Sequence, residues 1–177
     1  MHTAEHILNQ TMDRLFETGR SFRAHIEKKK SKCDYQFDRM LSDEELKRVE
    51  KQVNDIIQSD LPVLEKMVGR EEASRAYNME KVPEGAGDTI RIVSVGDYDS
   101  VPCIGEHVAK TSDIGKFYIT SADFEEGVLR LRFKLGERES AGGGHENRIT
   151  VKATVGAIIT RGDEILLALR NHEPFKN

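Results

Sequence analysis

The stretch VLRLRFKL at residues 128–135 is the clearest guide to the fold of this chain. From Leu129 onward, apolar and basic side chains alternate one by one, so all the apolar groups fall on one side. This two-residue period is typical of a strand that packs one face on a core and turns the other face to solvent. The stretch therefore predicts a half-buried antiparallel sheet.

Helical signals flank further strand patterns. Apolar residues recur at helical spacing over residues 3–16, and Gly19 follows them. Ser42 is a good helix N-cap, and Glu45 completes a capping box with it. A shorter helix is expected over residues 70–77, a hairpin over 21–38, and strands over 63–67, 90–95 and 116–121, with a turn over 96–100. The fold class expected is α+β, with helices packed on an antiparallel sheet and a C-terminal strand pair.

The composition changes after residue 137. We expect one domain over residues 1–137, a glycine-rich linker over 138–148 that contains AGGG at 141–144, and an incomplete second module over 149–177. In the last segment, two strands are expected over residues 151–160 and 164–170, around the turn Arg161-Gly162-Asp163.

Charge and cysteine content narrow the class of protein. The net charge of −4 argues against a generally basic nucleic-acid binder, although a local basic cluster remains compatible with it. The sequence shows no apolar run long enough for a membrane span. Two cysteines do not form a disulfide framework, so we expect reduced thiols and a cytoplasmic location.

Two short pairs of metal-binding residue types stand about a hundred residues apart. His2 and His6 form the first pair, and Cys103 and His107 form the second. A four-residue step on a helix returns to nearly the same face, so each pair can direct its side chains at one ion. Imidazole and thiolate together favour Zn²⁺ over Mg²⁺ or Ca²⁺. The alternative is a structural zinc that joins the N-terminal helix to the sheet.

The segments around these pairs carry a family resemblance. HTAEHIL at residues 2–8, CIGEHV at 103–108 and TSDIG at 111–115 resemble the editing domain shared by alanyl- and threonyl-tRNA synthetases. The pattern, which extends to about residue 135, looks most like the small stand-alone alanyl-tRNA editing proteins of the AlaX type. This resemblance implies a zinc-dependent hydrolase that removes serine or glycine from mischarged tRNA(Ala). Two other functions stay open: editing of Ser-tRNA(Thr), and a non-catalytic module that binds the tRNA acceptor end around a structural zinc.

Under this resemblance, metal-bound water is the expected nucleophile, although the metal could instead only orient the substrate. Four protein ligands describe a closed structural site, whereas a catalytic zinc usually keeps one position open. Thr3 is a candidate catalytic or substrate-binding residue, because its hydroxyl could hydrogen-bond a polar substrate side chain. The alternative for Thr3 is a helix N-cap.

Other candidate contacts lie on the predicted hairpin. The family resemblance implies that His25 borders the substrate pocket. The alternative is a His25 side chain that faces solvent. A basic cluster could contact the phosphates of the tRNA acceptor end, or could be an unpartnered hairpin tip; it consists of Lys28, Lys29, Lys30 and Lys32.

The two ends of the sequence suggest a larger protein. Residues 155–170 resemble the opening strands of a Nudix hydrolase domain, whose metal-binding helix would follow later, so no Nudix activity is expected. The alternative is a simple hairpin packed on the editing sheet. Only Met1 precedes His2, unlike in stand-alone editing proteins. His2 is therefore expected to be the weakest ligand, or the chain to be one piece of a longer protein.

Overall fold

The computed structural model describes residues 1–27, 30–83, 85–137, 159–161 and 164–166. The chain divides into two compact units, residues 1–140 and 141–177. In the second unit, β8 (Ile159–Arg161) and β9 (Glu164–Leu166) form an antiparallel pair, where strands were predicted. The predicted linker, the rest of these two strands and the turn residues 162–163 lie outside the described residues. Within the described part of the chain, no helix is both long and apolar enough to span a membrane.

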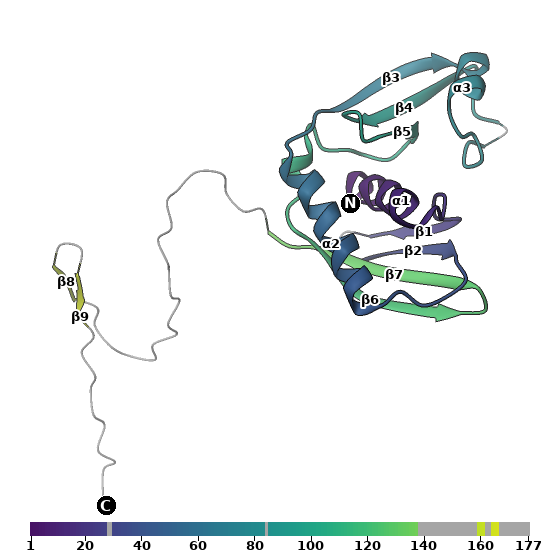
Figure 1. The fold of residues 1–177 in the computed structure, drawn as a ribbon. Helices are drawn as coiled ribbons and strands as arrows, with labels where there is room; N and C mark the ends of the chain where they lie inside the picture. The colour runs from purple at the N-terminus through teal and green to yellow at the C-terminus, as the bar shows by residue number, and fades with distance from the viewer. Residues whose placement is uncertain (28–29, 84, 138–158, 162–163, 167–177) are drawn as a thin grey trace, which may run out of the picture. The chain divides into compact units, whose positions relative to one another are not determined.

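The first unit contains a four-stranded antiparallel sheet in the order β1-β2-β7-β6 (Figure 1). Its strands are β1 (Arg23–Ile26), β2 (Ser31–Gln36), β6 (Phe117–Glu125) and β7 (Val128–Leu135). The alternation predicted from residues 128–135 is confirmed, because Leu129, Leu131 and Phe133 are fully buried while the basic residues between them are not. The α+β class with antiparallel sheets is confirmed as well.

A second antiparallel sheet has the order β3-β4-β5. It consists of β3 (Val63–Gly69), β4 (Thr89–Val95) and β5 (Asp99–Pro102), with the short helix α3 (Arg70–Ala76) after β3. Strand β5 was not predicted. The predicted turn over residues 96–100 was too long, because residues from Asp99 onward pair with β4. A 3₁₀ turn (Thr111–Asp113) leads into β6.

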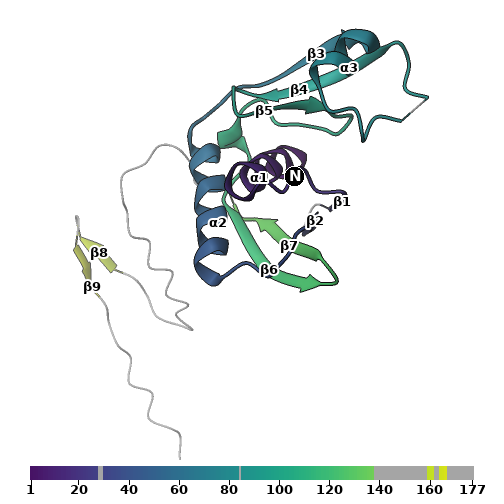
Figure 2. The ribbon, with the colours of Figure 1, turned by 45° about the vertical axis from the view of Figure 1, so that its right-hand side comes forward.

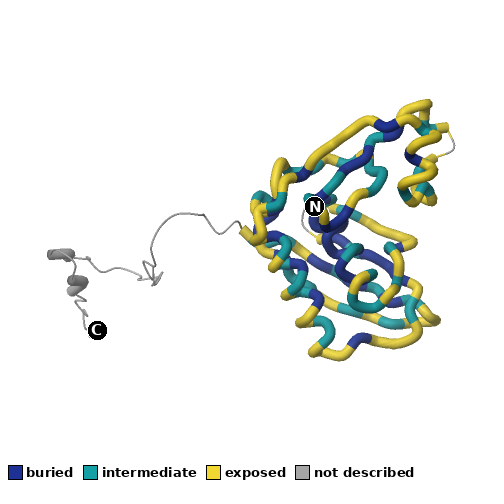
Figure 3. The backbone as a smooth tube through the Cα atoms, turned by 45° about the horizontal axis from the view of Figure 1, so that its top comes forward, coloured by how far each residue is buried: buried dark blue, intermediate teal, exposed yellow. Residues whose placement is uncertain are grey.

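Helix α1 (His2–Phe16) lies between the two sheets, and α2 (Asp43–Gln58) lies beside it (Figures 1 and 2). Because protein surrounds α1, its buried positions are not limited to one stripe (Figure 3). Apolar Ile7, Leu8 and Met12 join the main core, while the polar side chains of Glu5, His6 and Asn9 are also buried. Glu17, rather than Gly19, ends α1 in a left-handed conformation.

The predicted capping box of α2 is present. Glu45 N–H donates to Ser42 Oγ at 3.2 Å, and Ser42 N–H donates to Glu45 Oε2 at 2.8 Å. We expect Ser42→Ala to lower the free energy of unfolding by about 1 kcal/mol, because an N–H at the helix start loses its partner. Urea denaturation checks this, with Lys47→Ala on the exposed face of the same helix as control. Equal stability of the two variants would contradict the prediction.

Candidate metal centre

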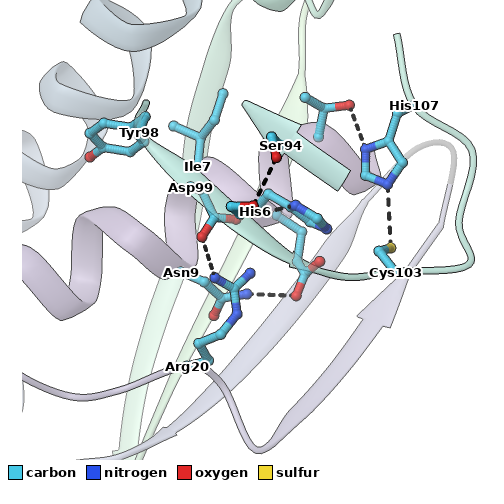
Figure 4. Close-up of polar contacts among 12 residues, drawn as sticks. His6, Ile7, Asn9, Arg20, Ser94, Tyr98, Asp99, Cys103 and His107 are labelled. Carbon is cyan, nitrogen blue, oxygen red and sulfur yellow. Dashed lines mark hydrogen bonds and ion pairs between the residues drawn. The ribbon is translucent and has the colours of Figure 1, made fainter. Parts of the chain in front are cut away.

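His6, Cys103 and His107 form a group that could hold a metal ion, since one ligand atom from each lies within 4.8 Å of the others (Figure 4). His6 comes from the second turn of α1, and the other two residues from the segment that follows β5. His107 Nε2 lies 3.3 Å from Cys103 Sγ. The assumption of a helical step between Cys103 and His107 is wrong, because residues 103–107 form an irregular loop. The loop nevertheless returns His107 to Cys103.

Thr3 holds the ring of His107. The Thr3 hydroxyl and His107 Nδ1 are hydrogen-bonded at 3.1 Å, and Val108 N–H donates to the same hydroxyl at 3.4 Å. With Nδ1 engaged, Nε2 of His107 is the nitrogen left for a metal. The alternative role of Thr3 as the helix N-cap is wrong, because α1 begins at His2 and Met1 occupies the N-cap position.

Asp99 and Arg20 support His6 from the other side of its ring (Figure 4). His6 Nδ1 lies 3.2 Å from Asp99 Oδ2, an ion-pair distance without the alignment of a hydrogen bond. Arg20 Nη1 donates to Asp99 Oδ1 at 2.7 Å. Burial lowers the pKa of His6, but Asp99 and Cys103 outweigh it and raise the pKa to about 9. Because Asp99 faces Nδ1, Nε2 is the nitrogen at which a metal would replace the proton of the His6 ring.

The remaining two side chains are electronically suited to a soft or borderline cation. Burial raises the pKa of the Cys103 thiol, but contacts with His6 and with Gly105 N–H outweigh it, so the net shift is downward. Burial, followed by the charge of His6, lowers the pKa of His107 to about 4, which favours its neutral form. A thiolate and imidazoles with one nitrogen free are zinc ligands, so the residues present fit Zn²⁺.

Arg91 on β4 anchors the loop that carries Cys103. Its Nη1 donates to Cys103 O at 2.9 Å and to Gly105 O at 2.8 Å. Its Nε donates to Glu65 Oε2 on the neighbouring strand β3 at 3.0 Å. The guanidinium therefore ties the irregular loop to two strands of the second sheet.

We expect Arg91→Lys to weaken Zn²⁺ binding about tenfold, because an ammonium group cannot hold the two carbonyls and the carboxylate together. Competition with a chromogenic chelator measures this. Arg39→Lys is the matched control, since Arg39 makes a two-pronged contact with Glu45 on α2's exposed start. Unchanged Zn²⁺ affinity in the Arg91 variant would show that the loop holds its shape without this anchor.

His2 lies next to the group but outside it. A Cβ atom built on Gly105 would stand 2.6 Å from the His2 ring, so this ring packs directly on the loop and would have to shift if residue 105 carried a side chain. The ring centroids of His2 and His107 are 6.0 Å apart. His2 as a fourth ligand therefore stays a prediction.

Among the described residues, the other predicted contact residues are not part of this group. His25 lies on the outer strand β1, where its Nε2 is 2.7 Å from Glu27 Oε1 and its side chain is 61% exposed. In the predicted basic cluster, Lys30 is exposed and Lys32 lies on β2, while Lys28 and Lys29 are outside the described residues.

A cavity of about 880 Å³ opens beside the candidate metal centre. Its lining includes Glu5, His6 and Cys103 together with residues from 18–22 and 78–91. Sequence reasoning missed Glu5, Arg20, Arg91 and Asp99. Only Glu5 had a local signal, an acidic side chain directly before a candidate ligand; the other three act through contacts between distant segments.

Comparison with known proteins relates this arrangement to tRNA synthetases. Residues 90–144, which include Cys103 and His107, match the family model described as "Threonyl and Alanyl tRNA synthetase second additional domain". The chain is similar to the alanine–tRNA ligase of Methanopyrus kandleri, with 33% identity over 144 residues that cover 77% of this chain and 15% of the ligase. It is also similar to the alanine–tRNA ligase of Caldivirga maquilingensis, with 35% identity over 149 residues that cover 77% of this chain and 16% of that ligase.

The chain thus spans about one sixth of the length of these relatives. The matches support a relation between this chain and the second additional domain of alanyl-tRNA synthetases, as the segments around the two His and Cys pairs indicated.

Proposed function

We propose that this chain is a zinc-dependent deacylase that hydrolyses mischarged aminoacyl-tRNA, with Ser-tRNA(Ala) or Gly-tRNA(Ala) as substrate. The observation that carries the proposal is the group of His6, Cys103 and His107 beside a cavity of about 880 Å³. The similarity to alanine–tRNA ligases favours tRNA(Ala) over tRNA(Thr). A cavity next to three converging ligands favours catalysis over binding alone.

His6, Cys103 and His107 would hold the Zn²⁺ ion. When bound, such an ion lowers the pKa of water and polarises an ester carbonyl. Three converging protein ligands, with His2 outside their group, are compatible with the open position that catalytic zinc sites keep. This arrangement supports a catalytic role over a structural one.

The chain's own residues position these ligands and enclose the substrate. Asp99 and Thr3 each engage Nδ1 of a ligand histidine, which fixes the ring orientation. Residue Thr3 is 1% exposed, and its hydroxyl already has two hydrogen-bond partners. Under this proposal, Thr3 therefore holds the ring of His107 in place. The cavity beside these ligands would hold the ester and orient it.

Further assignments belong to the same proposal. We assign the deacylase to residues 1–137 and the acceptor-end phosphates to the basic hairpin around Lys30 and Lys32, with His25 near the path of the nucleic acid. The strand pair β8–β9 supports the reading of residues 149–177 as the opening strands of a Nudix-like module.

The test is deacylation by the zinc-loaded chain of Ser-tRNA(Ala), Gly-tRNA(Ala), Ser-tRNA(Thr) and correctly charged Ala-tRNA(Ala). We expect rapid release of serine or glycine from tRNA(Ala) and slow release of alanine. Faster release from tRNA(Thr) would replace the proposal by the threonyl type of editing. A tRNA mobility shift without any release would make the chain a binding module.

A further inference from the structure

Glu5 is a buried carboxylate in the lining of the cavity, together with His6 and Cys103. The residue is only 8% exposed. Carboxylates are rarely buried unless they are paired, because removing a charge from water is costly. A charged group kept in the wall of a cavity therefore indicates a partner of opposite charge that enters the cavity.

The orientation of Glu5 is fixed from behind. Asn9 Nδ2, one helical turn away on α1, donates to Glu5 Oε1 at 2.6 Å. The Asn9 side chain is itself fixed, because its Oδ1 accepts a hydrogen bond from Ser21 N–H at 2.9 Å. Asn9 satisfies one oxygen of the carboxylate without neutralising its charge.

Three lysine and arginine side chains line the cavity: Arg20, Lys81 and Arg91. Lys81 Nζ donates to Ser21 Oγ at 3.5 Å. Arg20 pairs with Asp99, and Arg91 pairs with Glu65 and the loop carbonyls. Among the residues that the structure describes, no lysine or arginine forms an ion pair with Glu5. Within the described residues, Glu5 is thus a buried acidic side chain in the cavity wall that forms no ion pair with a lysine or arginine.

Glu5 also lies within electrostatic range of the candidate metal centre. Its charge favours the protonated form of His2, His6 and Cys103, although burial makes the net pKa shift of His2 downward, and contacts with His6 and Gly105 N–H do the same for Cys103. Glu5 is nevertheless outside the group of three whose ligand atoms converge within 4.8 Å. Its place is beside the centre rather than in it.

We propose that Glu5 binds the α-ammonium group of the aminoacyl ester, an inference that rests on the proposed deacylase function. In an aminoacyl ester, the ammonium is one carbon away from the scissile carbonyl. A carboxylate beside the metal centre could contact the ammonium while the neighbouring carbonyl lies at the metal centre. Glu5 would orient the ester and select esters with a free amine over esters whose amine is blocked or absent.

The test compares two non-hydrolysable adenosine probes on the zinc-loaded full chain. One carries serine through a 3′-amide, and the other is the same molecule with the α-amine replaced by a hydroxyl. We expect the hydroxyl probe to bind roughly 10- to 100-fold more weakly in calorimetry, because a charge-assisted contact is lost. In Glu5→Gln, the two probes should bind within about threefold of each other, since a neutral amide gains little from the ammonium.

Two controls keep the result specific. Glu80→Gln removes an exposed carboxylate from the same lining and should keep the preference for the amine. Zn²⁺ content should be unchanged in Glu5→Gln, whereas a loss of Zn²⁺ would make Glu5 a metal ligand and overturn the inference. Equal binding of both probes by the unaltered chain would overturn it without any variant, as would an amine preference that survives in Glu5→Gln.

The inference and the proposed function fail in different ways. Release of amino acid from mischarged tRNA tests the function, and the difference between the two probes tests Glu5. A chain that deacylates Ser-tRNA(Ala) but does not distinguish the probes retains its function and loses this role for Glu5.

Discussion

Replacing Cys103 by alanine is expected to abolish stoichiometric Zn²⁺ binding and to slow deacylation of Ser-tRNA(Ala) by about 100- to 1,000-fold. The thiol is the only sulfur ligand in the group with His6 and His107, and its lowered pKa favours the metal-binding thiolate. A zinc ion contributes several kcal/mol to stabilisation of the transition state, and each 1.36 kcal/mol is a factor of ten in rate. Elemental analysis and single-turnover deacylation measure the two effects.

The matched control is Cys33→Ala. Cys33 is a fully buried core residue on β2 whose pKa burial raises to about 12, so it has the properties of an apolar side chain rather than a ligand. This variant should lose stability but keep its Zn²⁺ and its activity when folded. A folded Cys103→Ala protein with full activity would falsify the metal-centred proposal.

Asp99→Asn should have the second largest effect. The Asp99 side chain is 2% exposed and lies between His6 Nδ1 and the guanidinium of Arg20. The substitution removes the negative charge that both groups face, so we expect a loss of about 1–3 kcal/mol in the free energy of unfolding. The orientation of His6 also becomes less constrained, which should weaken Zn²⁺ binding by about 10- to 100-fold.

Chemical denaturation of the zinc-free protein and Zn²⁺ competition separate these two effects. Asp97→Asn, two residues earlier and exposed in the turn before β5, is the control and should change neither quantity. If Asp99→Asn loses stability but binds Zn²⁺ as tightly as the original chain, Asp99 stabilises the fold without positioning His6.

Local patterns predicted the sheet and the helices well. The alternation in residues 128–135 and the capping box at Ser42 depend on neighbours within a few positions, so the sequence displays them directly. Strand β5 was missed because its four residues carry little pattern of their own and are strands only through pairing with β4. Such tertiary pairing overrides local preference.

The sequence predicted the residues of the candidate metal centre, but not the loop that brings two of them together. The spacing of Cys103 and His107 indicated a pair, but the pair converges in a loop that Arg91 holds from another strand. The roles of Arg91 and Asp99 depend on contacts with residues far away in the sequence. The spacing of residues along the sequence carries no information about such contacts. The position of His2 beside Gly105 was not predictable either, because it depends on the shape of the loop.

The position of α1 between the two sheets couples the unfolding of one sheet to that of the other. One core cluster contains residues of α1 and of both sheets, so separating the sheets would expose apolar side chains of that cluster to water. The two sheets therefore depend on one another through this helix, and we expect residues 1–137 to unfold as a single cooperative unit. His6 is part of the same helix, so opening of the fold and dispersal of the three candidate ligands would be one event.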